Sequence, residues 1–181
     1  MSLHIKLLLL FIAISLSACK GRLEKHGEAF AELIKNDEGV FRGLNIGDSQ
    51  DAVQDAEGIA PSESDANLLT YEGKTGETGN FNIKYGFESN KLYEILVEAE
   101  FDKLEEGQKM LVEFREYFNE KYGPYEKEGG YLVWNIANGS NNQPVTIEMV
   151  DESEFADFKQ WSLSIYLHKP VSENPVSQPA L

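Results

Sequence analysis

Cysteine and histidine, the residues that supply most nucleophiles and soft metal ligands, are rare in this chain of 181 residues. The sequence holds one cysteine, Cys19, and three histidines, His4, His26 and His168. No two of them have the spacing of paired zinc ligands, and only His168 lies near a predicted strand, where it could serve a serine nucleophile as base. The sequence therefore predicts a protein that is not an enzyme and holds no cofactor.

Acidic residues offer a second kind of chemistry, because carboxylate oxygens are the ligands that calcium prefers. Four of them gather in the segment DESEFADF between two predicted strands: Asp151, Glu152, Glu154 and Asp157. The segment lacks the spacing and the central glycine of an EF-hand. We interpret it as a solvated loop, with a calcium site at these four residues as the alternative.

The position of Cys19 indicates where the protein resides. Residues 1–6 carry one cation, and the apolar run of residues 7–16 is shorter than the about 20 residues that a membrane-spanning helix needs. A short apolar run of this kind is typical of a secretory signal. A lone cysteine after such a signal is either a free thiol or a modified one.

The four residues Leu16-Ser17-Ala18-Cys19 resemble the lipobox of bacterial lipoproteins. The resemblance implies that residues 1–18 are a signal peptide cleaved before Cys19, that a thioether links diacylglycerol to the sulfur, and that a fatty acid such as palmitate acylates the new amino terminus. Several acyl chains give stable anchoring, whereas one chain holds only marginally. In lipoproteins of the well-studied Gram-negative type, an aspartate just after the cysteine favours retention in the inner membrane. Lys20 at that position therefore favours the outer membrane.

The charge of the chain restricts its partners. The sequence has 16 basic and 31 acidic residues, a formal net charge of −15. Such a charge argues against nucleic acids and anionic membrane surfaces, and favours a basic protein partner. The hydrophobic fraction of 41% and the aromatic fraction of 11% are those of a globular protein.

These patterns divide the chain into four parts. Residues 1–18 are the signal peptide, and residues 19–29 are a polar, lipidated flexible tether. Residues 30–169 form one α+β domain. Residues 170–181 contain three prolines and no periodic pattern, and they are predicted to be a disordered tail.

The first half of the domain, residues 43–101, reads as one helix followed by three strands. Asp48 or Ser49 can cap a helix over residues 50–57, which Gly58 ends. Alternating apolar residues then predict strands at 67–73, 81–87 and 92–101. In the last two strands the residues expected on one face are Phe81, Ile83, Tyr85 and Phe87, and Tyr93, Ile95, Val97, Ala99 and Phe101.

The second half, residues 102–168, repeats this order. Asp102 begins a capping-box pattern, and Gly123 followed by Pro124 ends the helix. The apolar stripe of this helix consists of Leu104, Leu111, Phe114 and Phe118, broadened by Met110 and Tyr117. Three strands follow at residues 131–137, 144–150 and 160–168.

Together the halves predict tandem helix–strand–strand–strand repeats that form an antiparallel six-stranded sheet with helices on one face. The alternative is that short amphipathic segments align by chance, since residue identity between the halves is poor. The other face of the sheet is expected to carry the alternate strand residues, namely Lys84, Trp134, Thr146, Glu148 and Tyr166.

The segment GLNIGDSQDAVQDAEG is similar to the turn and helix of small outer-membrane barrel-assembly accessory lipoproteins. The matching residues are Gly47, Asp48, Ser49, Val53 and Gly58. The tandem plan of helices and strands is similar to that of the β-lactamase inhibitory protein family, although the second half lacks a glycine-led start. The resemblance implies protein binding through an exposed sheet face.

The candidate protein-binding residues are Trp134, Tyr166, Lys84 and Glu148. Trp134 and Tyr166 either belong to the core or anchor a partner, since tryptophan and tyrosine are enriched in binding hot spots. The sequence thus predicts a lipid-anchored, non-enzymatic protein-binding module of the cell envelope, of an assembly, inhibitor or immunity type. The alternative is an envelope lipoprotein that binds calcium or a small molecule.

Overall fold

Two runs of four antiparallel strands, each preceded by helical segments, make up the computed structural model, which describes residues 22–140, 143–151 and 161–168. The helical elements are η1 (Arg22–Lys25), α2 (Glu28–Ile34), α3 (Gln50–Glu57) and α4 (Leu104–Tyr122). The strands are β1 (Glu63–Ser64), β2 (Leu68–Thr75), β3 (Gly79–Glu88), β4 (Lys91–Phe101), β5 (Glu126–Glu128), β6 (Tyr131–Ser140), β7 (Gln143–Asp151) and β8 (Trp161–His168).

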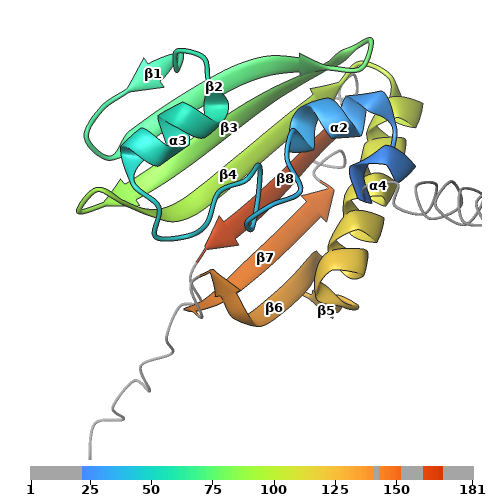
Figure 1. Cartoon of the computed structure of the whole chain (residues 1–181). Coiled ribbons are helices and arrows are strands. Elements are labelled where there is room, and N and C mark those ends of the chain that lie inside the picture. The colour runs from blue at the N-terminus through green and yellow to red at the C-terminus, as the bar shows by residue number, and fades with distance from the viewer. Residues whose placement is uncertain (1–21, 141–142, 152–160, 169–181) are drawn as a thin grey trace, which may run out of the picture.

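All the described strands belong to one antiparallel sheet (Figure 1). Its order is β1-β2-β3-β4-β8-β7-β6-β5, so the predicted α+β class is confirmed and the predicted number of six strands is wrong. The two additional strands, β1 and β5, have two and three residues, and all of these residues are exposed. Neither strand buries a face, so neither carries the apolar alternation by which strands are detected in a sequence.

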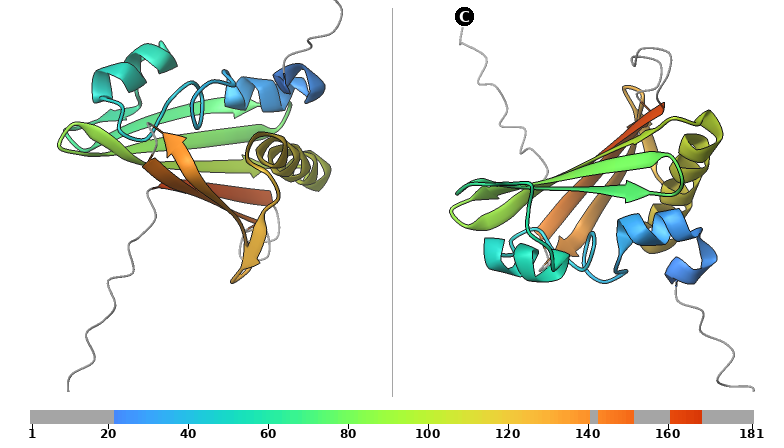
Figure 2. Two further views of the ribbon diagram at one scale, coloured as in Figure 1. Left: turned by 60° about the horizontal axis from the view of Figure 1, so that its bottom comes forward. Right: turned by 90° about the horizontal axis from the view of Figure 1, so that it is seen from above.

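The sheet consists of two four-stranded meanders that meet in its middle. Strands β1 to β4 follow one another in space as in the sequence, as do β5 to β8, and the last strands of the two meanders pair antiparallel. The pairing of Val97 with Ile165 lies at the centre of this contact. Figure 2 shows the strong twist of the resulting sheet.

The core lies on one face of the sheet. Cross-strand pairing places buried residues of six strands in one row: Leu69, Tyr85, Ile95, Leu167, Ile147 and Trp134. Buried residues of each described α-helix belong to the same cluster, among them Phe30 of α2, Val53 of α3 and Phe114 of α4. The helices therefore cover one face, as Figures 1 and 2 show. We call the opposite side of the sheet the helix-free face, because no described helix packs on it.

The helix ends follow the sequence signals at both ends of α3 and at the C-terminal end of α4, where Gly123 is the C-cap as predicted, but not at the N-terminal end of α4. Ser49 caps α3 by accepting a hydrogen bond from the Ala52 N–H at 3.3 Å, and Gly58 ends the helix with a left-handed φ of 65°. In α4 the predicted cap at Asp102 is wrong, because Lys103 occupies the N-cap position and gives no side-chain cap. Strand β4 runs to Phe101, so only two residues connect it to the helix.

Two residues predicted to face the core are exposed instead. Leu104 in the first turn of α4 keeps 57% of its surface exposed, and Tyr93 in β4 keeps 42%. The register of β3 and β4 shifts between Gly86 and Phe87, so Leu92 takes the buried position and Tyr93 moves to the other side. A single bulge of this kind inverts the alternation locally.

Helical structure is present in residues that were predicted to form a flexible tether. Residues 22–25 form η1 and residues 28–34 form α2, so the expectation of a flexible tether is wrong over residues 22–29. The apolar residues Leu23, Ala29 and Phe30 in this stretch pack into the core cluster. The predicted signal peptide, Cys19 and the predicted tail of residues 170–181 lie outside the described residues.

Candidate functional site

A row of side chains that differ in charge and polarity crosses the helix-free face. Cross-strand pairing joins Thr70, Lys84, Leu96, Tyr166, Glu148 and Val133, one residue from each of six strands. We call this set the central row. Its two ends, Thr70 and Val133, are buried, whereas the side chains of Lys84 and Glu148 keep 36% and 38% of their surface exposed. The row combines a cation, an apolar residue, an aromatic ring and a carboxylate, as a protein-binding surface does.

An ion pair, a hydrogen bond and a contact between a histidine and a carboxylate order the side chains around the central row. Lys84 Nζ lies 2.9 Å from Glu98 Oε2, and Asn82 Nδ2 donates to the same carboxylate oxygen at 3.4 Å. At the other end, His168 Nε2 lies 3.7 Å from Glu148 Oε2. These contacts limit the conformations of the side chains before any partner binds, which lowers the entropic cost of binding.

An acidic hollow lies beside the central row. Its volume is about 490 Å³, and its polar lining consists of Glu72, Asn80, Asn82, Glu98 and Glu100. These residues come from three adjacent strands, and register pairs Glu72 with Asn82 and Asn82 with Glu98. Three carboxylates share the hollow, and Lys84 pairs with one of them. The hollow is therefore suited to a cationic side chain rather than to an anion.

The structure brings together three of the four residues predicted to bind a protein. Lys84, Tyr166 and Glu148 all belong to the central row, as expected for the face opposite the helices. Their binding role stays a prediction. Trp134 does not join them.

The predicted place of Trp134 on the helix-free face is wrong. Its side chain is 2% exposed, its ring centroid lies 5.3 Å from that of Phe118 and 5.6 Å from that of Tyr125, and Nε1 donates to Asn119 Oδ1 at 3.1 Å. The β6 segment YLVWNIA has apolar residues on both of its faces. Alternation alone therefore cannot tell which face packs against the helices.

The structure also contains a buried ion pair that the sequence analysis did not find. Arg42 Nε and Nη2 donate to the two carboxylate oxygens of Glu57 at 2.8 and 2.6 Å, and the Tyr85 hydroxyl donates to the same carboxylate. Arg42 also donates to the main-chain oxygen of Leu33. The Arg42 side chain is 6% exposed and that of Glu57 is 1% exposed. This network joins α2, α3 and β3 and has a structural role, because both of its charged side chains are buried.

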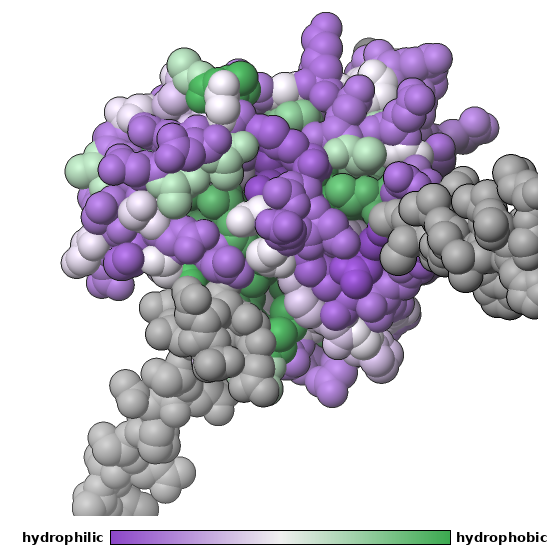
Figure 3. All heavy atoms as spheres, in the orientation of Figure 1, coloured by the Kyte–Doolittle hydropathy of each residue, from purple (hydrophilic) through white to green (hydrophobic). Residues whose placement is uncertain are grey.

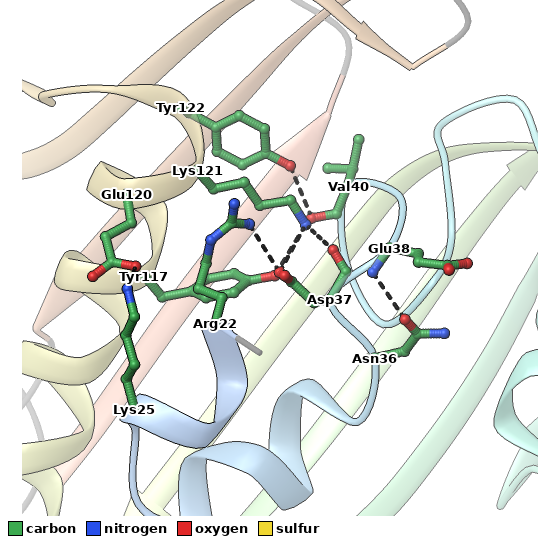
Figure 4. Close-up of polar contacts among 10 residues, drawn as sticks. All are labelled: Arg22, Lys25, Asn36, Asp37, Glu38, Val40, Tyr117, Glu120, Lys121 and Tyr122. Carbon is green, nitrogen blue, oxygen red and sulfur yellow. Dashed lines mark hydrogen bonds and ion pairs between the residues drawn. The ribbon is translucent and has the colours of Figure 1, made fainter. Parts of the chain in front are cut away.

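A second cluster surrounds Asp37, between α2 and α4 (Figure 4). Arg22 Nη1 donates to Asp37 Oδ1 at 3.0 Å, and Lys121 Nζ donates to the Asp37 main-chain oxygen at 2.7 Å and to the Tyr117 hydroxyl at 3.0 Å. The Tyr122 hydroxyl donates to the main-chain oxygen of Val40 at 3.2 Å. We call these residues the Asp37 cluster. Through Asp37, the cluster links Arg22 of η1 to Lys121 of α4.

The Asp37 cluster predicts a dependence of stability on alkaline pH. Burial lowers the pKa of Lys121 to about 8 from its ordinary 10.5, although Asp37 opposes the shift. Between these values the unfolded chain binds more protons at Lys121 than the folded chain, so stability rises with pH. We expect the free energy of unfolding in urea to rise from pH 8 to 9.5, by at most about 1.4 kcal/mol per pH unit.

The Lys121→Met variant should lose this rise. Lys109→Met is the matched control, because Lys109 lies on the same helix and its side chain is 68% exposed. A rise that survives in Lys121→Met, or that disappears in Lys109→Met, would contradict the assignment.

The remaining predicted site residues are not brought together. Asp151 ends β7 and is exposed, while Cys19, Glu152, Glu154 and Asp157 lie outside the described residues. Among the residues that the structure describes, no group of three side chains could hold a metal ion. Of the described helices, none is both long and apolar enough to span a membrane.

Comparisons with known proteins identify no relative of this chain. Neither a protein-family model, nor a curated protein, nor a solved structure matches the chain.

Proposed function

We propose that this chain is a lipid-anchored protein of the cell envelope, attached through Cys19, that binds another protein through its helix-free face. The proposal rests on one observation: the central row and the acidic hollow lie side by side on a face that no described helix covers. The lipobox resemblance supports the anchor and, through Lys20, the outer membrane. The protein would act in the envelope as an assembly factor, an inhibitor or an immunity protein.

The duplicated plan inferred from the sequence supports the same function. Each meander places its last strand at the centre of the sheet, and the central row crosses this junction between Leu96 and Tyr166. Two repeats joined in this way form a surface twice as wide as one repeat could provide. Such a surface suits a protein partner better than a small molecule.

Charge complementarity defines the partner's chemistry. The chain has a net charge of −15, and three carboxylates line the hollow. We infer that the partner presents lysine or arginine side chains to the hollow, and an apolar or aromatic side chain to Leu96 and Tyr166. Association should then weaken as salt screens the charges.

A charge-matched pair of variants tests this proposal. The triple variant Glu72→Gln, Glu98→Gln, Glu100→Gln should weaken capture of the native partner about tenfold at low salt, if each exposed pair contributes about 0.5 kcal/mol. The control triple variant Glu28→Gln, Glu105→Gln, Glu116→Gln removes the same charge from exposed positions on α2 and α4 and should leave capture unchanged. Equal effects of the two variants would show that net charge, not this face, attracts the partner.

Cross-linking locates the contact directly. A photo-reactive amino acid in place of Tyr166 should cross-link the captured partner, whereas the same residue in place of Val112, exposed on α4, should not. The proposal fails if cross-links form from residue 112 and not from residue 166.

A further inference from the structure

The first described residues are attached to the helical layer rather than extended from it. Gly27 N–H donates to Glu113 Oε1 at 2.9 Å, and Lys25 Nζ donates to Glu120 Oε2 at 3.0 Å. These contacts join the end of η1 and the start of α2 to two points on α4 that lie about two helical turns apart. With the Arg22–Asp37 pair, they fix the direction from which the chain enters the domain.

Only a short length of chain separates this attached segment from the proposed lipid. Three residue steps lead from Cys19 to Arg22. A fully extended chain spans at most about 3.6 Å per residue, so Cys19 lies within about 11 Å of Arg22 whatever conformation the intervening residues adopt. A diacylglycerol on the Cys19 sulfur would place that residue at the membrane interface.

The attached segment lies on the side of the sheet that carries the helices. Figure 2 shows η1, α2 and α3 on one side of the strands in both views, with the helix-free face turned the opposite way. We propose that the short connection holds the corner formed by η1, α2 and α4 against the lipid bilayer that carries the anchor, and turns the helix-free face toward the aqueous compartment. This inference rests on the lipid anchor of the proposed function.

Among the described residues of η1, both cations already have acidic partners. Arg22 and Lys25 are already paired with Asp37 and Glu120, and Glu24 is exposed beside them. The visible helical side is mainly hydrophilic, with separate apolar residues (Figure 3). A surface without excess cations is not attracted to anionic headgroups. The orientation therefore depends on the anchor and on the attached segment, and zwitterionic lipids should suffice.

Depth measurements on the acylated full-length protein test the inference. The thioether consumes the Cys19 sulfur, so an introduced cysteine is the only thiol available for a fluorescent label. Glu24→Cys places the label on η1 and Glu72→Cys places it on the helix-free face, and both residues are exposed. In phosphatidylcholine vesicles with nitroxide-labelled headgroups, we expect quenching at residue 24 to exceed that at residue 72 at least threefold.

A lengthened connection is the matched control. Twenty Gly and Ser residues inserted between Gly21 and Arg22 leave the domain unchanged and extend the average reach by about 25 Å. The quenching ratio should then approach one. Equal or reversed quenching in the unmodified chain would overturn the orientation alone. Absence of the diacylglycerol mass, or failure of the protein to float with vesicles, would overturn both the anchor and the orientation.

Discussion

Replacing Glu57 by alanine is expected to lower the free energy of unfolding by about 3–5 kcal/mol. The carboxylate lies in the interior and accepts hydrogen bonds from two nitrogens of Arg42 and from the Tyr85 hydroxyl. Its removal leaves a buried guanidinium without a counter-ion, which costs more than the pair itself contributes. Urea unfolding followed by circular dichroism measures the loss.

Two further variants separate the ion pair from general damage to α3. Asp55→Ala changes an exposed acid on the same helix and should alter stability by less than about 0.5 kcal/mol. The double variant Arg42→Leu, Glu57→Leu should lose less stability than the sum of the two single leucine variants, because no charge remains buried alone. Strict additivity of the two leucine variants would show that the residues do not act as a pair.

Acid pH should reproduce part of the loss of stability that we expect for Glu57→Ala. Burial alone would raise the pKa of Glu57, but the hydrogen bonds and the charge of Arg42 outweigh it and lower that pKa below its ordinary 4.5. Between the two values the folded chain binds fewer protons than the unfolded chain, so stability falls as the pH falls. The contribution of Glu57 is complete above its unfolded pKa and lost below its folded one. Glu57→Ala should abolish this component of the acid dependence.

The buried pair also shows where sequence analysis reaches its limit. Helix α3 was predictable because Ser49 and Gly58 are local signals at its two ends. The burial of Glu57 is not local, because it follows from the packing of the last residue of α3 against Tyr85 and Arg42. No periodic pattern links residues 42 and 57. The sequence therefore indicated the helix and not the contact that holds it.

The helix-free face was predictable to the same extent. Alternation within β3, β7 and β8 assigned Lys84, Glu148 and Tyr166 to the face opposite the apolar residues, and the structure places them there. Their alignment in one row depends on the register between β4 and β8, in which Leu96 pairs with Tyr166. Register between strands distant in sequence is set by the packed core, so alternation within single strands could not predict this row.

Trp134→Ala is expected to lower the free energy of unfolding by about 3–5 kcal/mol, because it opens a cavity between β6 and α4. The ring contacts Phe118 and Tyr125, and the indole N–H has a partner in Asn119. Trp134→Phe keeps an aromatic ring and loses the hydrogen bond, so we expect a smaller loss of about 1–2 kcal/mol. Urea unfolding of both variants provides the comparison.

Tyr166→Ala is expected to affect binding more than stability, in contrast to Trp134→Ala. Trp134 and Tyr166 were predicted to share a binding role, but the structure places them on opposite faces of the sheet. Tyr166 is half-buried in the central row, so its truncation should cost about 1 kcal/mol of stability and reduce partner capture. Partner capture by the folded fraction of Trp134→Phe should be unchanged, since Trp134 lies on the face of the sheet that the helices cover. A Trp134→Ala protein that keeps full stability but loses its partner would instead place Trp134 on the binding surface.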